Sequence, residues 1–474
     1  MKTTKRILAT LLAMACAFSA VGCSKGGDKD SSYEPLIEVP DTEDISAIPD
    51  SSDKTIDWLC YWDINPGKGT PEKRADLQLF EQKGGTINYK RTTSMKKYDA
   101  LAEQVLGGTP PDMFPFDTGM VFPCNVVQGM FQPIDSIVDF DSGLWADVKE
   151  TSEQYALNGK HYVAPINFTP LSVITYEQST IDNNGLDDPY SLYLQGKWDW
   201  DAMMNIMTEW SATGTAEKPH YGINGWFQPF IFHSTGETLI KYDDATKTYT
   251  SNINNANLER AANYLYEIGK NGLYYPDWLG QASDAFEKDI LFYAMGTWAS
   301  VGSHTPTESD NWVVVPIPKD PNNDQYILSP DVSAYMWVKG SDKTDAMKCW
   351  FECAKIVTTD EGYKAISKEK FKIENPYWSE SAYDMAYNEI ISNKFIRLGD
   401  PGYGITTTLS NNDAAENASK EAIVAYMYSS VLKSDDETGA QFTWTQLRGT
   451  YASKIQNELD EFNKTFADFL AEDK

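Results

Sequence analysis

The chain is long, strongly acidic and rich in aromatic residues. It has 474 residues and a formal net charge of −29, with 69 Asp and Glu against 40 Lys and Arg. Such a charge repels nucleic-acid phosphates and anionic lipid headgroups, which excludes nucleic acid as a partner and an electrostatic hold on a membrane surface. The length is sufficient for two or three domains with a sizeable core.

The first 22 residues predict an export signal. Three basic residues among the first six precede a mainly apolar run that is too short to span a bilayer comfortably. Cys23 directly follows Gly22, which resembles the lipobox of bacterial lipoproteins, although Ala20 stands where that motif usually has Leu. The resemblance implies that Cys23 is acylated and anchors the protein to the outer face of the cell membrane. The alternative is an ordinary secretory signal with an incidental cysteine.

Residues 23–54 are predicted to be a flexible acidic tether behind Cys23. They are rich in Ser, Gly, Asp, Glu and Pro and carry few apolar residues with which to order themselves. Order is expected to begin at Thr55.

The cysteines that follow the tether are expected to be buried free thiols, because they lie in apolar surroundings: Cys60, Cys124, Cys349 and Cys353. The four histidines are scattered along the sequence, so we predict no metal site. No motif indicates a cofactor.

Strands and helices alternate along the remaining chain. Apolar spacing predicts strands at 55–62, 86–91, 113–116, 162–166, 171–176, 311–318 and 333–338. Helical spacing predicts helices at 71–83, 98–106, 199–212, 256–271, 343–357 and 449–472. This alternation is typical of layered α/β proteins with parallel strands.

Several short motifs follow one another along the chain. They are Gly107-Gly108-Thr109-Pro110-Pro111-Asp112, Gly129 through Asp135, Gly159 through Pro165 with Leu171 through Tyr176, Ala294 through Trp298, and Thr358 through Gly362. These motifs and their order resemble those of the extracellular solute-binding proteins of ABC importers, of the maltodextrin-binding type. We expect most of these residues to build turns and helix ends, with Asp112 bonding its own turn and Thr358 or Thr359 as an N-cap.

The resemblance covers residues 55–470 and implies a two-lobed α/β fold of the type II periplasmic-binding-protein kind. Each lobe would be a mainly parallel sheet flanked by helices, with a ligand cleft between the lobes and a helical C-terminal region. The first lobe is predicted at 55–166 with about 312–342, and the second at 167–311 with about 343–474.

Aromatic and polar residues just past predicted strands are the candidate ligand contacts. An indole ring can stack on the apolar face of a sugar, while carboxylate, amide and hydroxyl groups bond its hydroxyls. The candidates are Trp62 and Asp63 after the first strand, Asp117 after the third, Thr169 in the first crossing between lobes, Asn224, Trp226 and Trp298. By the resemblance, Trp226 and Trp298 match the ring-stacking aromatics, and Thr169 stands where maltodextrin binders carry a carboxylate. Each of these residues has an alternative role in plain packing.

The combined prediction is a monomeric, non-catalytic receptor that captures a sugar and delivers it to the permease subunits of an ABC importer. The usual motifs of serine hydrolases, zinc proteases and nucleotide-binding proteins are absent from the sequence. A lipid-anchored surface glycoside hydrolase and a glycan-adhesion protein are the alternatives, since 69 acidic residues could supply a catalytic carboxylate pair.

Overall fold

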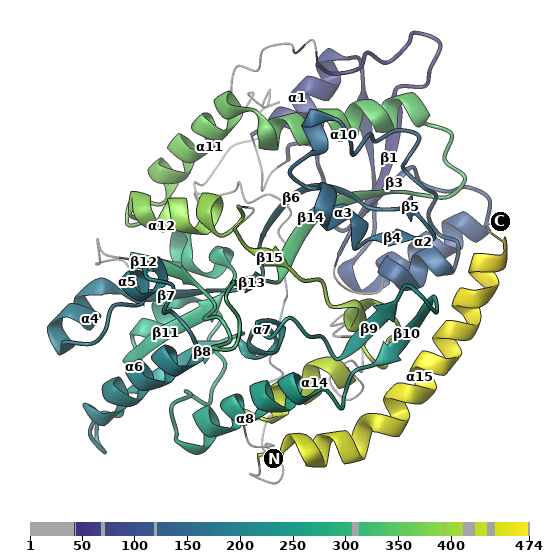
Figure 1. Ribbon diagram of the computed structural model, residues 1–474. Coiled ribbons are helices and arrows are strands. Elements are labelled where there is room, and N and C mark those ends of the chain that lie inside the picture. The colour runs from purple at the N-terminus through teal and green to yellow at the C-terminus, as the bar shows by residue number, and fades with distance from the viewer. Residues whose placement is uncertain are drawn as a thin grey trace, which may run out of the picture.

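The computed structural model describes residues 42–472, except 43, 68–71, 118–120, 306–311, 393, 411–421 and 434–440. The predicted export signal, Cys23 and the first part of the predicted tether lie outside the described residues. Two larger sheets, one of five strands and one of four, are each covered by helices and organise the described part of the chain (Figure 1). Three two-stranded sheets accompany them in the same part of the chain.

The strands are β1 (Thr55–Cys60), β2 (Thr86–Arg91), β3 (Met113–Pro115), β4 (Ala156–Leu157), β5 (Lys160–His161), β6 (Ala164–Pro170), β7 (Val173–Glu177), β8 (Tyr221–Gly225), β9 (Ile240–Asp243), β10 (Thr248–Ser251), β11 (Ile290–Met295), β12 (Trp312–Pro316), β13 (Ile327–Leu328), β14 (Pro330–Trp337) and β15 (Ile396–Arg397).

The α-helices are α1 (Ala75–Gln82), α2 (Lys97–Leu106), α3 (Lys149–Glu153), α4 (Gln178–Asn184), α5 (Pro189–Leu194), α6 (Trp200–Ala212), α7 (Gln228–His233), α8 (Ala256–Lys270), α9 (Ala282–Phe286), α10 (Thr344–Thr359), α11 (Glu361–Glu374), α12 (Glu380–Asp384), α14 (Ile423–Ser430) and α15 (Trp444–Glu472).

The first lobe is built on the sheet β2-β1-β3-β14-β6. β1 runs parallel to β2 and β3, whereas β14 is antiparallel to both β3 and β6. Helix α10 packs its apolar face on this sheet, where Trp350 contacts the rings of Phe80 and Tyr335. The sheet therefore combines four strands from residues 55–170 with one strand from residues 330–337.

The second lobe is built on the sheet β12-β7-β11-β8. β11 runs parallel to β8, and β7 is antiparallel to both β11 and β12. The predicted two-lobed α/β fold is confirmed, but the expectation of mainly parallel sheets is wrong because strands from crossing segments insert in the antiparallel sense. β12 belongs to the second sheet and α10 to the first lobe, so the predicted lobe limits at 312 and 343 differ from the observed pairing.

Ordered packing begins before Thr55, in the segment predicted to be tether. Ile45 and Ile48 are buried in the first lobe's core, and Ser46 donates to the Glu352 carboxylate from its backbone N at 2.7 Å and its hydroxyl at 3.1 Å. Two isoleucines three residues apart are sufficient to hold this stretch against α10, so the expectation of a flexible tether is wrong for residues 44–54.

Two motif residues have roles different from those expected. The Asp112 carboxylate accepts the Asp57 backbone N–H at 2.7 Å and the Ser341 hydroxyl at 2.6 Å, so it joins β1 to the loop after β14 rather than bonding its own turn. The N-cap of α11 is Asp360, whose carboxylate accepts from Gly362 and Tyr363. The threonines before it, Thr358 and Thr359, belong to α10, because that helix continues two residues further than its apolar spacing indicates.

Chain segments from three distant regions lie side by side where the lobes meet. The Leu171 N–H donates to the Ser329 carbonyl at 3.0 Å, and the Leu398 N–H donates to the Leu328 carbonyl at 2.8 Å. β13 also pairs in parallel with β15. These backbone bonds form the connection between the two sheets.

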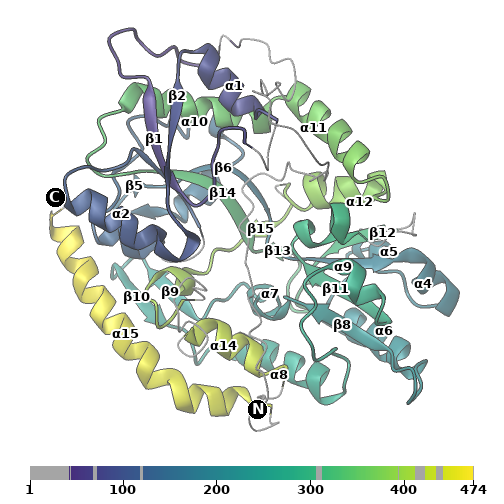
Figure 2. The same cartoon turned by 180° about the vertical axis from the view of Figure 1, so that it is seen from behind.

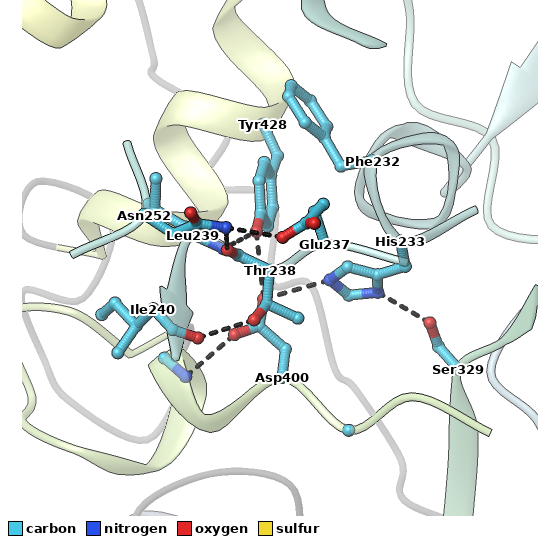
Figure 3. A network of polar contacts seen from close by, with 12 residues as sticks. Phe232, His233, Glu237, Thr238, Leu239, Ile240, Asn252, Ser329, Asp400 and Tyr428 are labelled. Atoms are coloured by element: carbon cyan, nitrogen blue, oxygen red, sulfur yellow. Dashed lines mark hydrogen bonds and ion pairs between the residues drawn. The ribbon is translucent and has the colours of Figure 1, made fainter. Parts of the chain in front are cut away.

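A buried polar network fixes this crossing to the second lobe (Figure 3). His233 Nδ1 lies 2.7 Å from Ser329 Oγ, and His233 Nε2 lies 3.0 Å from Asp400 Oδ2. The Tyr428 hydroxyl donates to the same carboxylate oxygen at 3.1 Å and accepts the Leu239 N–H at 3.0 Å. His233 is 2 % exposed and Ser329 6 % exposed. The network therefore lies in the interior and not at a surface that a substrate could reach.

Helix α15 is attached to both lobes. Near its start, the Trp444 ring packs at a tilt against Phe232, with 5.3 Å between ring centroids, and its indole N–H donates to the Ile253 carbonyl. Near its end, Phe469 contacts Tyr162, which lies between β5 and β6 of the first lobe. In both views the helix follows the outer edge of the molecule (Figures 1 and 2).

We predict that Ile48→Ala lowers the free energy of unfolding by about 2–4 kcal/mol, since it removes a buried side chain from the first lobe's core. Urea unfolding followed by tryptophan fluorescence measures the change. Ser51→Ala, in the exposed turn next to it, is the matched control and should have almost no effect. Equal stability of the Ile48→Ala variant and the parent would show that the 44–54 segment does not pack as described.

We predict that Asp400→Asn destabilises the protein by about 2–4 kcal/mol, because it takes the charge from a buried carboxylate that accepts from His233 and Tyr428. Ser329→Ala should cost only about 1 kcal/mol, the usual value for one neutral hydrogen bond. Thermal unfolding of the two variants in parallel measures the difference. Equal losses of stability in the two variants would contradict the proposed contribution of the Asp400 charge.

Candidate functional site

The carboxyl ends of the parallel strands β1 and β3 bring three predicted residues to one edge of the first sheet, Trp62 and Asp63 after β1 and Asp117 after β3. Trp62 follows β1 and is half-buried, with its ring packed edge-on against Trp58 at 5.1 Å between centroids. The Arg74 guanidinium lies 5.7 Å from the Trp62 ring centroid, a distance suited to a cation–π contact. Asp63 is exposed, and its carboxylate accepts the backbone and side-chain N–H groups of Asn65, which gives it a role in the local turn.

Asp117 follows β3 and is held in a fixed position. It forms an ion pair with Lys97 and accepts the Tyr98 hydroxyl at 2.6 Å. The Lys97 ammonium lies 4.9 Å from the Tyr98 ring centroid and 5.4 Å from that of Tyr61, so it is surrounded by aromatic faces as well as by the carboxylate. Asp117 is therefore oriented, partly exposed and compensated by one cation.

Thr169 lies opposite an aspartate that the sequence analysis missed. In the register of β6 and β14, Thr169 pairs with Asp331 and Asn167 pairs with Ser333. These four residues are partly exposed, and the residues between them are buried, so they share one polar face. The Phe116 N–H donates to the Ala334 carbonyl at 3.1 Å, which places Asp117 beside the same face.

Burial raises the pKa of Asp331 to about 6, and the nearby charge of Asp117 adds to the rise. Burial raises the pKa values of Tyr61 and Tyr155, and the nearby Asp331 charge adds to both rises. The sequence alone does not identify Asp331 as a candidate site residue, because it lies more than 160 residues from Thr169 along the chain. Only the insertion of β14 between β3 and β6 brings a carboxylate next to the position where the resemblance implies one.

Trp226 and Trp298 occupy one edge of the second sheet. β8 and β11 are parallel neighbours with Gly225 opposite Ala294, and each tryptophan follows the carboxyl end of its strand. Both indoles are half-buried and pack against the same apolar cluster. The indole of Trp298 covers Gly296, where an added Cβ would lie 2.5 Å from the indole nitrogen and 3.3 Å from the Leu171 carbonyl oxygen. A larger residue at this position would displace the Trp298 indole, which lies next to the crossing segment.

Asn224 has a supporting position instead of an exposed one. It is fully buried, and its amide donates to the carbonyls of Tyr275 at 3.0 Å and Asp277 at 2.9 Å. This side chain holds the 275–277 loop beside β8, two residues before Trp226. The expectation that Asn224 faces a ligand does not fit this burial.

The predicted residues thus form two groups, one on each lobe. Trp62, Asp63, Asp117 and Thr169 lie on the first lobe, and Trp226 and Trp298 lie on the second. Leu171, two residues after Thr169, lies between the groups along the chain and borders Gly296 beneath Trp298. The first lobe carries hydrogen-bond acceptors and the Trp62 indole, and the second carries two indoles.

A separate cavity of 660 Å³ lies on the first lobe and contains none of these residues. It is lined by Thr42 and Asp44, by residues of the 135–145 loop and by α10 with the start of α11. The cavity lies beside the N-terminal end of the 44–54 segment, away from the strand ends that carry the predicted site residues.

Within the described ranges, Cys60, Cys124, Cys349 and Cys353 are buried free thiols, as predicted. The same residues contain no cluster of three or more His, Cys, Asp or Glu arranged to hold a metal ion. Nor does any helix in the described part of the chain have the length and apolar character needed to cross a bilayer.

Solved structures similar to this chain share its fold. The galacto-N-biose-/lacto-N-biose I-binding protein of an ABC transporter from Bifidobacterium longum, in complex with lacto-N-biose, has a TM-score of 0.60 at 12 % identity, covering 88 % of this chain and 99 % of that one. An ABC substrate-binding protein from Listeria monocytogenes in complex with cycloalternan has a TM-score of 0.53 at 18 % identity, covering 88 % and 100 %. A cyclo/maltodextrin-binding protein complexed with maltotetraose has a TM-score of 0.57 at 14 % identity, covering 85 % and 97 %.

Comparison with curated protein sequences gives no match. The family model described as bacterial extracellular solute-binding protein matches residues 78–370, which is more than half of the chain and includes strands of both sheets. The chain belongs to the family of bacterial extracellular solute-binding proteins.

Proposed function

We propose that this protein is the substrate-binding component of an ABC importer for a sugar or oligosaccharide. The observation that carries the proposal is the pair Trp226 and Trp298, two half-buried indoles on adjacent parallel strand ends. Flat indoles match the apolar faces of sugar rings, and the polar face with Asp117, Thr169 and Asp331 offers acceptors for sugar hydroxyls. Similar folds in complex with lacto-N-biose, cycloalternan and maltotetraose support the same ligand class.

The proposed mechanism is capture by closure. A solute that contacts both groups of residues stabilises the state in which the lobes approach each other, and the backbone-bonded crossing serves as the hinge. The closed, monomeric receptor then delivers the solute to the permease subunits. The lipid at Cys23 would keep it on the outer face of the cell membrane.

A catalytic role has less support. Ser329, His233 and Asp400 have the residue types of a hydrolytic triad, but all three side chains are buried. His233 is used on both ring nitrogens, and Asp400 also accepts from Tyr428 and Gly402. This network stabilises the crossing, and we propose binding without chemistry. Chromatography of oligosaccharides incubated with the protein would reveal products if a glycoside hydrolase were present instead.

We predict that Trp298→Ala weakens sugar binding by about 2–4 kcal/mol, because it removes a ring face at the centre of the proposed site. A thermal-shift screen of a carbohydrate panel identifies a ligand, since binding to the native state alone raises stability. Isothermal titration calorimetry then measures the change. Trp298→Phe keeps an aromatic ring and should retain part of the affinity. An unchanged affinity in the alanine variant would remove Trp298 from the site.

We predict that the same ligand makes the protein more compact. Small-angle X-ray scattering with and without saturating sugar measures the radius of gyration, which should fall on binding. A surface adhesion protein that holds glycans without closing would bind the sugar at constant radius. That result would contradict the importer mechanism while leaving sugar binding intact.

A further inference from the structure

Asp331 is a carboxylate without a partner in the described part of the chain. The neighbouring acid Asp117 has Lys97 and Tyr98, whereas no described residue donates a hydrogen bond to Asp331 or forms an ion pair with it. Its side chain is partly exposed on the polar face of β14, opposite Thr169. A partly enclosed carboxylate that lacks a cation is available for a ligand.

The surroundings of Asp331 resemble those of Asp117 with one component missing. Lys97 is bound by Asp117 and by the rings of Tyr61 and Tyr98, a site for an ammonium group made from one carboxylate and two aromatic rings. Around Asp331, the Tyr61 and Tyr155 side chains lie close enough for its charge to add to the effect of their burial, but no Lys or Arg of the described residues pairs with it. Lys97 pairs with Asp117, and Asp331 has no such cation among the described residues.

Charge selects among the ligands that could fill this position. A sugar hydroxyl can donate to Asp331 but leaves its negative charge uncompensated, whereas an ammonium group donates and compensates together. An anionic sugar would meet two carboxylates and the field of a chain with net charge −29. Neutral hydroxyls are thus acceptable here, cations favourable and anions excluded.

We propose that the solute taken by this protein carries a protonated amine beside its hydroxyls, as an amino sugar does, and that Asp331 receives the ammonium group. The inference rests on the proposed function, because it assigns a ligand class to the same site. Trp226 and Trp298 would stack on the sugar ring. Asp331 would give sugars with an amine a higher affinity than the same sugars with a hydroxyl in that position.

The proposal has a pH dependence of definite sign. With a pKa raised to about 6, Asp331 is ionised near pH 7 and mostly protonated near pH 5. A bound ammonium requires the ionised form, so affinity for the amine should fall as the pH decreases through about 6. The other charged or titratable groups facing Asp331 are Asp117 with its Lys97, Tyr61 and Tyr155, and both tyrosines stay neutral over this range because their pKa values are raised.

Calorimetry with matched sugar pairs tests the proposal. The pairs are glucosamine with glucose, galactosamine with galactose, and β-1,4-linked glucosamine oligomers with glucose oligomers of equal length. At pH 7 the amine member of the bound pair should bind at least tenfold more tightly. Asp331→Asn should reduce the affinity for the amine at least tenfold and that for the hydroxyl member less than threefold. Asp141→Asn removes one charge from an exposed site on the same lobe and should change neither.

The outcomes separate this inference from the proposed function. Equal or tighter binding of the hydroxyl member, or an equal loss of both in Asp331→Asn, would overturn the amine assignment and leave sugar binding standing. Binding of no sugar of either kind would overturn both. Since the variant could fold poorly, the unmutated protein gives a second readout. Its affinity for the amine should drop between pH 7 and pH 5, and a flat profile would contradict the role of Asp331.

Discussion

The crossing between the lobes is the constraint on which the rest of the structure depends. Three segments from distant parts of the chain pass it together, and backbone hydrogen bonds at Leu171–Ser329 and Leu328–Leu398 hold them in contact. The buried His233 imidazole lies between Ser329 and Asp400 and contacts both side chains, so it links the crossing to helix α7 of the second lobe. Because β6 and β14 begin or end at this point, any shift of the crossing would move Thr169 and Asp331 together.

The two lobes make unequal chemical contributions. The first presents carboxylates and a hydroxyl on the ends of mixed strands, and the second presents two indoles on parallel strand ends. Each set alone is an ordinary surface, since half-buried tryptophans and oriented aspartates are common in proteins. Recognition of a ring with one apolar face and a polar rim requires both, which couples ligand binding to the relative position of the lobes.

Local patterns predicted many of the elements, but not the pairings made at long range. Apolar spacing located β2 at its observed bounds, because period and turn signals are local properties. The family resemblance indicates Trp226 and Trp298, since apolar spacing does not predict the strands before them, β8 and β11. Asp331 could not be foreseen by either route, since its place beside Thr169 depends on which strand β14 joins. The burial of Asn224 and the early ordering at Ile45 also depend on tertiary packing that a single sequence does not display.

The 29-residue helix α15 affects how the two lobes can move. A helix of this length extends roughly 43 Å at 1.5 Å per residue, and its two ends touch different lobes. The crossing and the Phe469 contact with Tyr162 are thus two separate attachments between the lobes. A movement of one lobe relative to the other must either carry the end of α15 along or break its contact with Tyr162. The C-terminal helix is therefore mechanically coupled to any closure of the lobes, although it lies outside the residues proposed to meet the solute.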